Sequence, residues 1–247
     1  MTSILTFAVV SFLVGFLLGS IPWGVIISKL FFRTDIREHG SGNIGTTNAF
    51  RTMGPVGGVA VFSLDFLKGL LAGGLAMIFA VLAAFDVSSY AAGALVGGAE
   101  PLTIFGVVIN DTASLTALNT HVFGLIQGLG LVGCISGHIF SPWLHFKGGK
   151  GIAVAVGCLF FVFGWQGALV SLGIFIALVI ITRIISIGSI AAAVTAPGVA
   201  FWVSDGEPFF VLMAFIAGGL VVWAHRANIV RLRTGNEPKI GSKKAAS

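Results

Sequence analysis

Charged residues are scarce in this chain of 247 residues: Asp, Glu, Lys and Arg together make up 9% of it, while hydrophobic residues make up 56%. In soluble domains charged residues make up roughly a quarter of the chain, so this composition excludes an ordinary soluble fold. Long apolar runs replace the missing charges, and those at residues 4–28 and 152–182 are long enough to cross a hydrocarbon core of about 30 Å. We therefore expect an all-α polytopic membrane protein.

Cysteine and the common catalytic motifs are also sparse. The two cysteines, Cys134 and Cys158, lie in apolar runs without the paired spacing of a metal or redox centre. The sequence contains no GxSxG or HExxH motif, and the His-x4-Asp arrangement of many acyl-CoA-dependent acyltransferases is missing as well. We therefore expect neither a metal ion nor another cofactor.

The basic residues that are present fall into a few short segments. Because Lys and Arg favour cytoplasmic loops, we place residues 33–51, residues 147–150 and the C-terminal tail in the cytoplasm. Residues 86–120 include acidic residues but no Lys or Arg, which predicts an extended external segment. The whole chain, 1–247, is expected to form a single integral-membrane domain.

The apolar runs between these segments predict about seven transmembrane helices, with the amino terminus outside and the carboxyl terminus cytoplasmic. The first run lacks a basic n-region and a cleavage site, so we expect it to be retained rather than removed as a signal peptide. The expected helices cover residues 4–32, 57–84, 122–144, 186–203 and 209–223, with two more between Lys150 and Arg183.

Two stretches allow alternatives. Between Lys150 and Arg183, two short helices with a turn near residues 164–167 satisfy the charge pattern, and one tilted helix with Arg183 misassigned is the alternative. On the outer face, residues 91–109 are apolar enough for a re-entrant or interfacial pair of helices. Glu100-Pro101 in the middle of this stretch favours a surface cap over a plain transmembrane helix.

The first cytoplasmic loop holds the densest run of glycine and small polar residues, from His39 to Arg51. Glycine allows successive backbone N–H groups to point into a concavity that holds an anion. Ser, Thr and Asn side chains add donors, and Arg51 adds a planar fork suited to phosphate. The pattern favours a phosphate-binding loop over a flexible polar turn.

Three other patterns carry polar groups. Lys147-Gly-Gly-Lys150 places two ammonium groups beside flexible backbone, which suits an anion or simple membrane anchoring, but it lacks the Ser or Thr of a Walker loop. Residues 225–239 are basic, and on a helix His225 and Asn228 share a face; the alternative is a lipid-surface anchor. Asp65 and Lys68, three residues apart inside a predicted helix, can form an ion pair, for which we favour a structural role.

Together these segments resemble one family, the bacterial acyl-phosphate:glycerol-3-phosphate acyltransferases (PlsY family). The resemblance covers about Gly19 to Gly241 and departs from the family pattern at Thr46, where alanine is usual, at Pro142, which is displaced by one position, and at Val154, which replaces threonine. The motifs that carry it are residues 40–51, Asp65-x-x-Lys68-Gly69, residues 137–151, Thr182-Arg183 with Ser186 and Ser189, and residues 225–239.

The resemblance implies an enzyme of the bacterial cytoplasmic (inner) membrane that moves a fatty acyl group from acyl-phosphate to the 1-hydroxyl of glycerol 3-phosphate. The products would be lysophosphatidic acid and phosphate. The implied partners are the two substrates, the lipid bilayer and the soluble enzyme that forms acyl-phosphate, with no nucleic acid. A transporter of a phosphorylated anion is the main alternative, but the anion-binding groups share one face and no internal repeat is visible.

The resemblance also implies roles for individual residues, while the general base stays open among His225, His138 and a phosphate oxygen of the substrate. The acyl chain is expected to lie between helices, open to lipid. The implied catalytic residues, which would hold glycerol 3-phosphate, are Ser41, Arg51, Lys150, His225 and Asn228. Those implied to bind the acyl-phosphate are Gly42, Asn43, Gly45, Thr47, Asn48, Lys147, Gly148 and Gly149.

Overall fold

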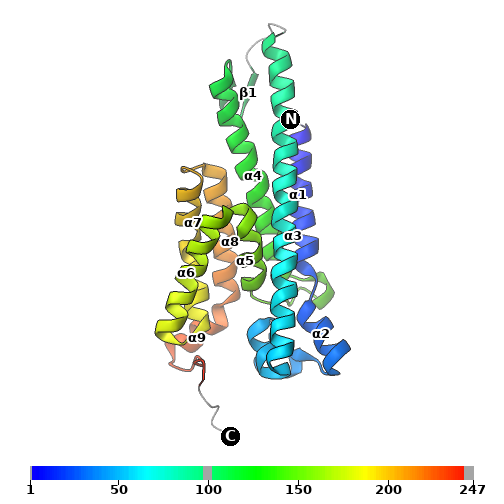
Figure 1. The fold of residues 1–247 in the computed structure, drawn as a ribbon, viewed down its shortest axis with the longest axis vertical. Helices are drawn as coiled ribbons and strands as arrows, with labels where there is room; N and C mark the ends of the chain where they lie inside the picture. Colours follow the sequence, from blue (N-terminus) through cyan, green and yellow to red (C-terminus); the bar gives the residue numbers. More distant parts are fainter. Residues whose placement is uncertain (1, 97–101, 242–247) are drawn as a thin grey trace.

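A computed structural model describes residues 2–96 and 102–241 as an elongated helical bundle (Figure 1). Helices α1, α3 and α4 form one group, α6, α7 and α8 form another, and the short α5 contacts both. The elements are α1 (Thr2–Ser20), α2 (Trp23–Phe32), η1 (Ile36–Glu38), α3 (Thr46–Val96), β1 (Leu102–Ile104), β2 (Val107–Ile109), α4 (Thr112–Ile139), η2 (Pro142–Leu144), α5 (Ile152–Val162), α6 (Gly164–Thr182), α7 (Ile185–Val203), α8 (Pro208–Ala224) and α9 (Arg226–Arg233).

The length and hydropathy of these helices confirm a helical membrane protein. Among the described residues, five helical segments are long and apolar enough to cross a membrane, and α8 with α9 makes a sixth if their 58° bend lies within one span. Helix α5 has 11 residues and is therefore about 16 Å long, too short for a hydrocarbon core of about 30 Å. The predicted count of seven crossings and the predicted orientation of the termini stay predictions.

Two predicted helix boundaries near the amino terminus are wrong. The helix expected at residues 4–32 is interrupted at Ile21-Pro22, because proline has no N–H to continue the helical hydrogen bonds. The helix expected at residues 57–84 extends at both ends to become α3. Its first turns are set off by Gly54, whose φ of 70° and ψ of −168° are not helical.

The later boundaries agree better. Two helices do lie between Lys150 and Arg183, and they meet at Phe163-Gly164, beside the predicted turn. Helices α7 and α8 begin and end within one residue of the predictions. The third predicted helix, 122–144, is α4, which begins ten residues earlier and ends at Ile139.

The segment 86–120, predicted as an external loop, is largely helical. Helix α3 continues to Val96, and α4 begins at Thr112, where the Asp111 side chain accepts a hydrogen bond from the Ser114 N–H as an N-cap. The short antiparallel β1–β2 hairpin lies between them, rather than a re-entrant helical pair, and Glu100 and Pro101 fall outside the described residues. Figure 1 shows the hairpin at the opposite end of the bundle from α9.

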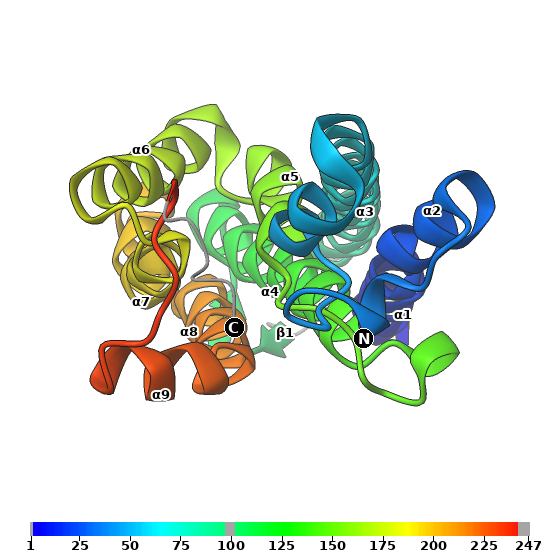
Figure 2. The same ribbon diagram turned by 90° about the horizontal axis from the view of Figure 1, so that it is seen from below.

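Close packing of the helices brings the polar loops together at the other end. At Gly137 of α4, a Cβ atom would lie 2.1 Å from the Phe16 carbonyl oxygen of α1, so only glycine allows this approach. At Gly69 of α3, a Cβ atom would lie 2.0 Å from the Val154 carbonyl oxygen of α5. Figure 2, which looks at this end of the bundle, shows α2, the start of α3 and α9 arranged around it.

Candidate active site at the loop end of the bundle

Asn48 organises the first loop from inside. Its side chain is buried, and its Nδ2 group lies 3.0, 3.0 and 2.9 Å from the carbonyl oxygens of Ile36, His39 and Asn43. The Asn48 Oδ1 atom accepts a hydrogen bond of 2.9 Å from the Ser41 N–H. The Asn48 amide is therefore engaged within the loop and holds the backbone in a closed curve.

At the start of α3, the Asn48 and Ala49 N–H groups bond to the Gly45 carbonyl oxygen, and the Thr46 and Thr47 N–H groups come before them. The Gly42 and Gly45 N–H groups are used inside the loop, by the His39 carbonyl oxygen at 3.0 Å and the Asn43 Oδ1 atom at 2.9 Å. The first N–H groups of a helix have no intrahelical partner, and they favour an anion. The Thr46 Oγ1 atom beside them is buried without a hydrogen-bond partner among the described residues.

The bend between α8 and α9 presents His225 and Asn228, which are 2% and 4% exposed. The His225 Nδ1 atom lies 2.8 Å from the Val221 carbonyl oxygen, which can only accept, so Nδ1 carries the hydrogen and Nε2 is left as an acceptor. Burial lowers the pKa of His225 to about 4, although the hydrogen bond to Val221 raises it. His225 is thus neutral near pH 7.

Glu237 connects α7 with α9 through its carboxylate. Its carboxylate accepts hydrogen bonds from Asn228 Nδ2 at 2.5 Å, Ser186 Oγ at 2.8 Å and Arg231 Nε at 2.7 Å. Burial raises the pKa of Glu237, but these three donors outweigh burial and hold it below its ordinary value. Sequence reasoning did not select Glu237, although it belongs to the motif at residues 225–239.

Lys150 lies within electrostatic range of the same groups. Burial lowers the pKa of Lys150 to about 8, with Glu237 acting to raise it and the cations Arg231 and Arg51 acting to lower it. Arg51 comes from α3 and Lys150 from the loop before α5, so separate segments supply the positive charge. Lys150 is thus within electrostatic range of Arg51, His225 and Glu237, and Glu237 bonds to Asn228; we refer to Arg51, Lys150, His225 and Asn228 as the polar cluster.

The chain is similar to known proteins along most of its length. The sequence profile of the family described as glycerol-3-phosphate acyltransferase matches residues 9–235. The glycerol-3-phosphate acyltransferase of Acaryochloris marina is 37% identical over 95% of this chain and 93% of its own. That of Rhodopseudomonas palustris is 36% identical over 96% and 97%. The chain belongs to the glycerol-3-phosphate acyltransferase family.

Solved structures of glycerol-3-phosphate acyltransferases agree with this membership. The crystal structure of PlsY (YgiH), described as an integral membrane glycerol 3-phosphate acyltransferase in its glycerol 3-phosphate form, is 31% identical, with a TM-score of 0.67 over 97% of this chain and 96% of its own. The lysophosphatidic acid form is 30% identical, with a TM-score of 0.66 over 95% of each chain. This acyltransferase is accordingly a multi-pass integral membrane protein.

In this acyltransferase, the glycines of the second loop, residues 147–150, also form hydrogen bonds within the protein. The Gly148 N–H donates to the Ile139 carbonyl oxygen at 2.9 Å, and the Gly149 N–H donates to the His138 carbonyl oxygen at 3.0 Å. These hydrogen bonds close the end of α4. They also fix the backbone between Lys147 and Lys150.

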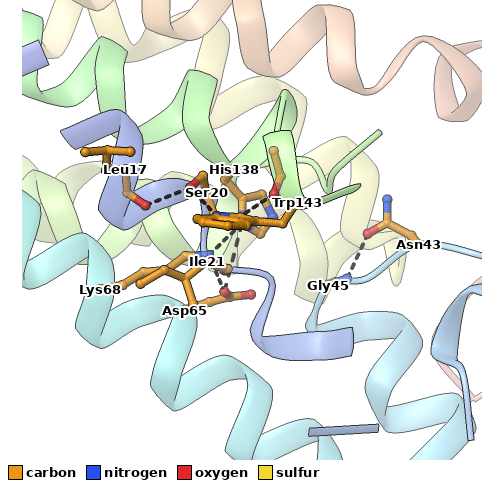
Figure 3. Close-up of polar contacts among 10 residues, drawn as sticks. Leu17, Ser20, Ile21, Asn43, Gly45, Asp65, Lys68, His138 and Trp143 are labelled. Atoms are coloured by element: carbon orange, nitrogen blue, oxygen red, sulfur yellow. Dashed lines mark hydrogen bonds and ion pairs between the residues drawn. The ribbon is translucent and has the colours of Figure 1, made fainter. Parts of the chain in front are cut away.

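A polar junction, shown in Figure 3, adjoins the loop of residues 147–150 through His138. The predicted Asp65–Lys68 pair is present, with 2.8 Å between Oδ1 and Nζ. Lys68 also donates to the Ile21 carbonyl oxygen at 2.6 Å, in the break between α1 and α2. The polar junction consists of Ser20, Ile21, Asp65, Lys68, His138, Ser141 and Trp143, which hydrogen bonds and the ion pair connect.

An apolar cavity opens beside the cluster, between α4, α5, α6, α7 and α8. Leu131, Leu159 and Phe175 are among the side chains that line it. Val221, whose carbonyl oxygen holds His225, lines it too, so the cavity begins next to the polar groups.

Proposed function

We propose that this protein transfers a fatty acyl group from acyl-phosphate to the 1-hydroxyl of glycerol 3-phosphate, forming lysophosphatidic acid and inorganic phosphate. The observation that carries the proposal is the convergence of Arg51 from α3, Lys150 from the second loop and Asn228 from α9 at one end of the bundle. The glycerol 3-phosphate and lysophosphatidic acid forms of the solved relatives match the acceptor and the product.

The chemistry needs positioning more than a protein nucleophile. The acceptor hydroxyl oxygen attacks the acyl carbonyl carbon, the bond from that carbon to the phosphate oxygen breaks, and phosphate leaves with the electron pair. A mixed anhydride is already activated, so no covalent intermediate on the protein is required. Arg51 and Lys150 would hold the acceptor phosphate, and the start of α3 with Lys147 would stabilise the leaving phosphate.

The hydroxyl proton needs an acceptor, and the geometry favours one histidine over the other. His225 is neutral, with Nε2 available as an acceptor. The Nδ1 atom of His138 is occupied by Lys68 at 3.1 Å, and its Nε2 edge faces Gly149. The candidates for the base are therefore His225 Nε2 and a phosphate oxygen of the substrate.

The residues implied to bind phosphate divide into two groups by their contacts. In this proposal Ser41 and Thr47 contact substrate directly, because neither is buried, and Asn43 contacts it only through Nδ2, because its Oδ1 atom accepts from the Gly45 N–H. Asn48, Gly42, Gly45, Gly148 and Gly149 act through the backbone curve, since their polar groups are engaged within the protein.

The acyl chain and the cellular setting follow from the same arrangement. The apolar cavity beside His225 would take the acyl chain, since it lies between helices next to the polar cluster. The basic loop end would face the cytoplasm of a bacterial inner membrane, where soluble glycerol 3-phosphate is available. That face would also admit the soluble enzyme that supplies acyl-phosphate.

Purified protein in lipid nanodiscs, incubated with labelled glycerol 3-phosphate and acyl-phosphate, tests the proposal. We expect lysophosphatidic acid and inorganic phosphate in equal amounts, and far less product with acyl-CoA as donor. Lys150→Met should reduce the rate by roughly one to two powers of ten, the loss of one charge-assisted contact of about 1.5–3 kcal/mol. Lys29→Met is the matched control, because Lys29 is an exposed lysine that pairs with Asp35 at 3.2 Å. Absence of product from the wild-type protein with either donor would refute the proposal.

A further inference from the structure

We propose that His138, held in place by Lys68, is a positioning residue for the loop that carries Lys147 and Lys150. His138 is 4% exposed, belongs to the polar junction and adjoins Gly149 of this loop. The inference rests on the proposed function, because it takes Lys150 as a ligand of glycerol 3-phosphate. Five contacts carry it.

Lys68 fixes the ring of His138. The Lys68 ammonium donates hydrogen bonds to the Ile21 carbonyl oxygen at 2.6 Å and to His138 Nδ1 at 3.1 Å, and it forms an ion pair with Asp65 Oδ1 at 2.8 Å. An ammonium has no acceptor, so His138 Nδ1 accepts and the ring hydrogen is on Nε2. The tautomer and the orientation of the ring are thereby set from α3.

The opposite edge of the ring supports the loop. A Cβ atom at Gly149 would lie 2.2 Å from His138 Nε2, 3.0 Å from Cδ2 and 3.1 Å from Cε1. These three atoms all belong to the imidazole, so the Gly149 backbone rests directly on the ring. A shift of the ring therefore moves Gly149.

The backbone transmits this support to the lysine. The Gly149 N–H is bonded to the His138 carbonyl oxygen at 3.0 Å, so the loop is attached to residue 138 through both its backbone and its side chain. Lys150 is the next residue in the chain. The chain of contacts thus runs from Lys68 to the His138 ring, to Gly149 and then to the ammonium of Lys150.

A double-mutant cycle between His138 and Gly149 tests the contact. Gly149→Ala alone should raise KM for glycerol 3-phosphate about tenfold, the effect of weakening one charge-assisted contact. His138→Asn alone should raise it less, because Asn still offers Lys68 an acceptor but loses the Nε2 edge. In the double variant, the new methyl group occupies the space left by the ring, so KM should fall below that of Gly149→Ala alone.

Gly148 provides the matched control. A Cβ atom there would lie 2.0 Å from the His138 carbonyl oxygen, a backbone atom that no side-chain substitution removes. Gly148→Ala should therefore combine multiplicatively with His138→Asn, without rescue. Rescue at position 149 but not at 148 supports the positioning role. Multiplicative effects at both positions overturn it.

Lys68 is tested in a charge-neutral background. Because Lys68→Met alone would leave the Asp65 carboxylate buried and unpaired, it is combined with Asp65→Asn. This pair of changes should raise KM for glycerol 3-phosphate several-fold and make the further change His138→Asn nearly silent, since the ring has already lost its fixed orientation. If His138→Asn has the same effect on KM in this background as in the wild-type protein, the role of Lys68 is overturned.

Two readouts separate positioning from simple stability. A merely structural role would lower the midpoint of thermal unfolding and the yield but leave KM of the folded protein unchanged, and that result overturns the inference. Direct calorimetric titration with glycerol 3-phosphate, run on the same variants, follows the coupling without turnover. If the wild-type protein binds glycerol 3-phosphate but forms no lysophosphatidic acid, the proposed function fails. The same double-mutant cycle, measured as Kd by calorimetry, still decides the positioning role.

Discussion

Lys150 is partly buried, which disfavours the protonated form of its side chain. Burial lowers its pKa to about 8, so the ammonium that binds phosphate is present below pH 8 and lost as the pH rises through that value. The second pKa of the acceptor phosphate is about 6, so the charge of this phosphate is constant around pH 8. We predict that kcat/KM for glycerol 3-phosphate falls above about pH 8.

Lys150→Arg is the variant that checks this assignment. Arginine stays protonated to about pH 12, so the fall should move to much higher pH even if the absolute rate is lower. The measurement is the shape of the pH profile, corrected for spontaneous hydrolysis of acyl-phosphate. An unchanged midpoint in Lys150→Arg would assign the titration to another group.

Glu237 joins three donors that sequence reasoning did not connect. A glutamine in its place cannot accept from Ser186 and Asn228 on one side and from Arg231 on the other, because one of its two polar atoms is a donor. The lost charge-assisted bond is worth about 1.5–3 kcal/mol. We predict that Glu237→Gln raises KM for glycerol 3-phosphate by about tenfold or more.

A second carboxylate provides the comparison for Glu237. Glu207 is also buried, accepts hydrogen bonds from the Phe209 and Phe210 N–H groups, and lies 2.8 Å from His121, but it caps α8 in another part of the bundle. Glu207→Gln should lower thermal stability and leave KM unchanged. Equal KM effects in the two variants would mean that Glu237 acts only through global stability.

At the scale of an element, the break in α3 sets the direction of its first turns, which carry Arg51. Gly54 has φ of 70° and ψ of −168°, a region essentially restricted to glycine, and an added Cβ atom would meet nothing within 4 Å. Gly54→Ala should therefore cost about 1–3 kcal/mol from backbone strain alone. We predict a lower unfolding midpoint together with a higher KM for glycerol 3-phosphate.

Gly93 of the same helix is the control, because an added Cβ atom there also meets nothing within 4 Å and its φ is not positive. Gly93→Ala should be neutral or stabilise the helix by up to about 1 kcal/mol. If Gly54→Ala behaved like Gly93→Ala, the first turns of α3 could straighten without harm to the site.

At the scale of the whole molecule, the loops and the hairpin lie at opposite ends of the bundle (Figure 1). We predict that Ala227→Cys on α9 reacts with a membrane-impermeant thiol reagent only from the cytoplasm, and Ala113→Cys at the start of α4 only from outside. Both alanines are exposed, whereas the native Cys134 and Cys158 are buried and provide an unreactive background. Labelling of Ala113→Cys from the cytoplasm alone would invert or refute the predicted topology.

Much of the fold and part of the site could be predicted from the sequence, because hydropathy and charge are local properties. Scarce charge identified a membrane protein, and the clustering of basic residues selected the loops that carry Arg51, Lys150 and His225. The break between α5 and α6 was also predicted, since the spacing of charges favoured two helices there over one tilted helix.

The remaining features depend on contacts between residues far apart in the chain. The hydropathy pattern marks only the residues suited to the hydrocarbon core. It could not show that α3 continues to Val96, beyond the apolar run, and packs against α4. Nor could it show which polar groups are already engaged: Asn48 is used inside its own loop, and Lys68 meets His138, 70 positions away. Only the tertiary structure decided these partners, because a hydrogen bond requires two groups within about 3 Å, and sequence spacing does not determine that distance across helices.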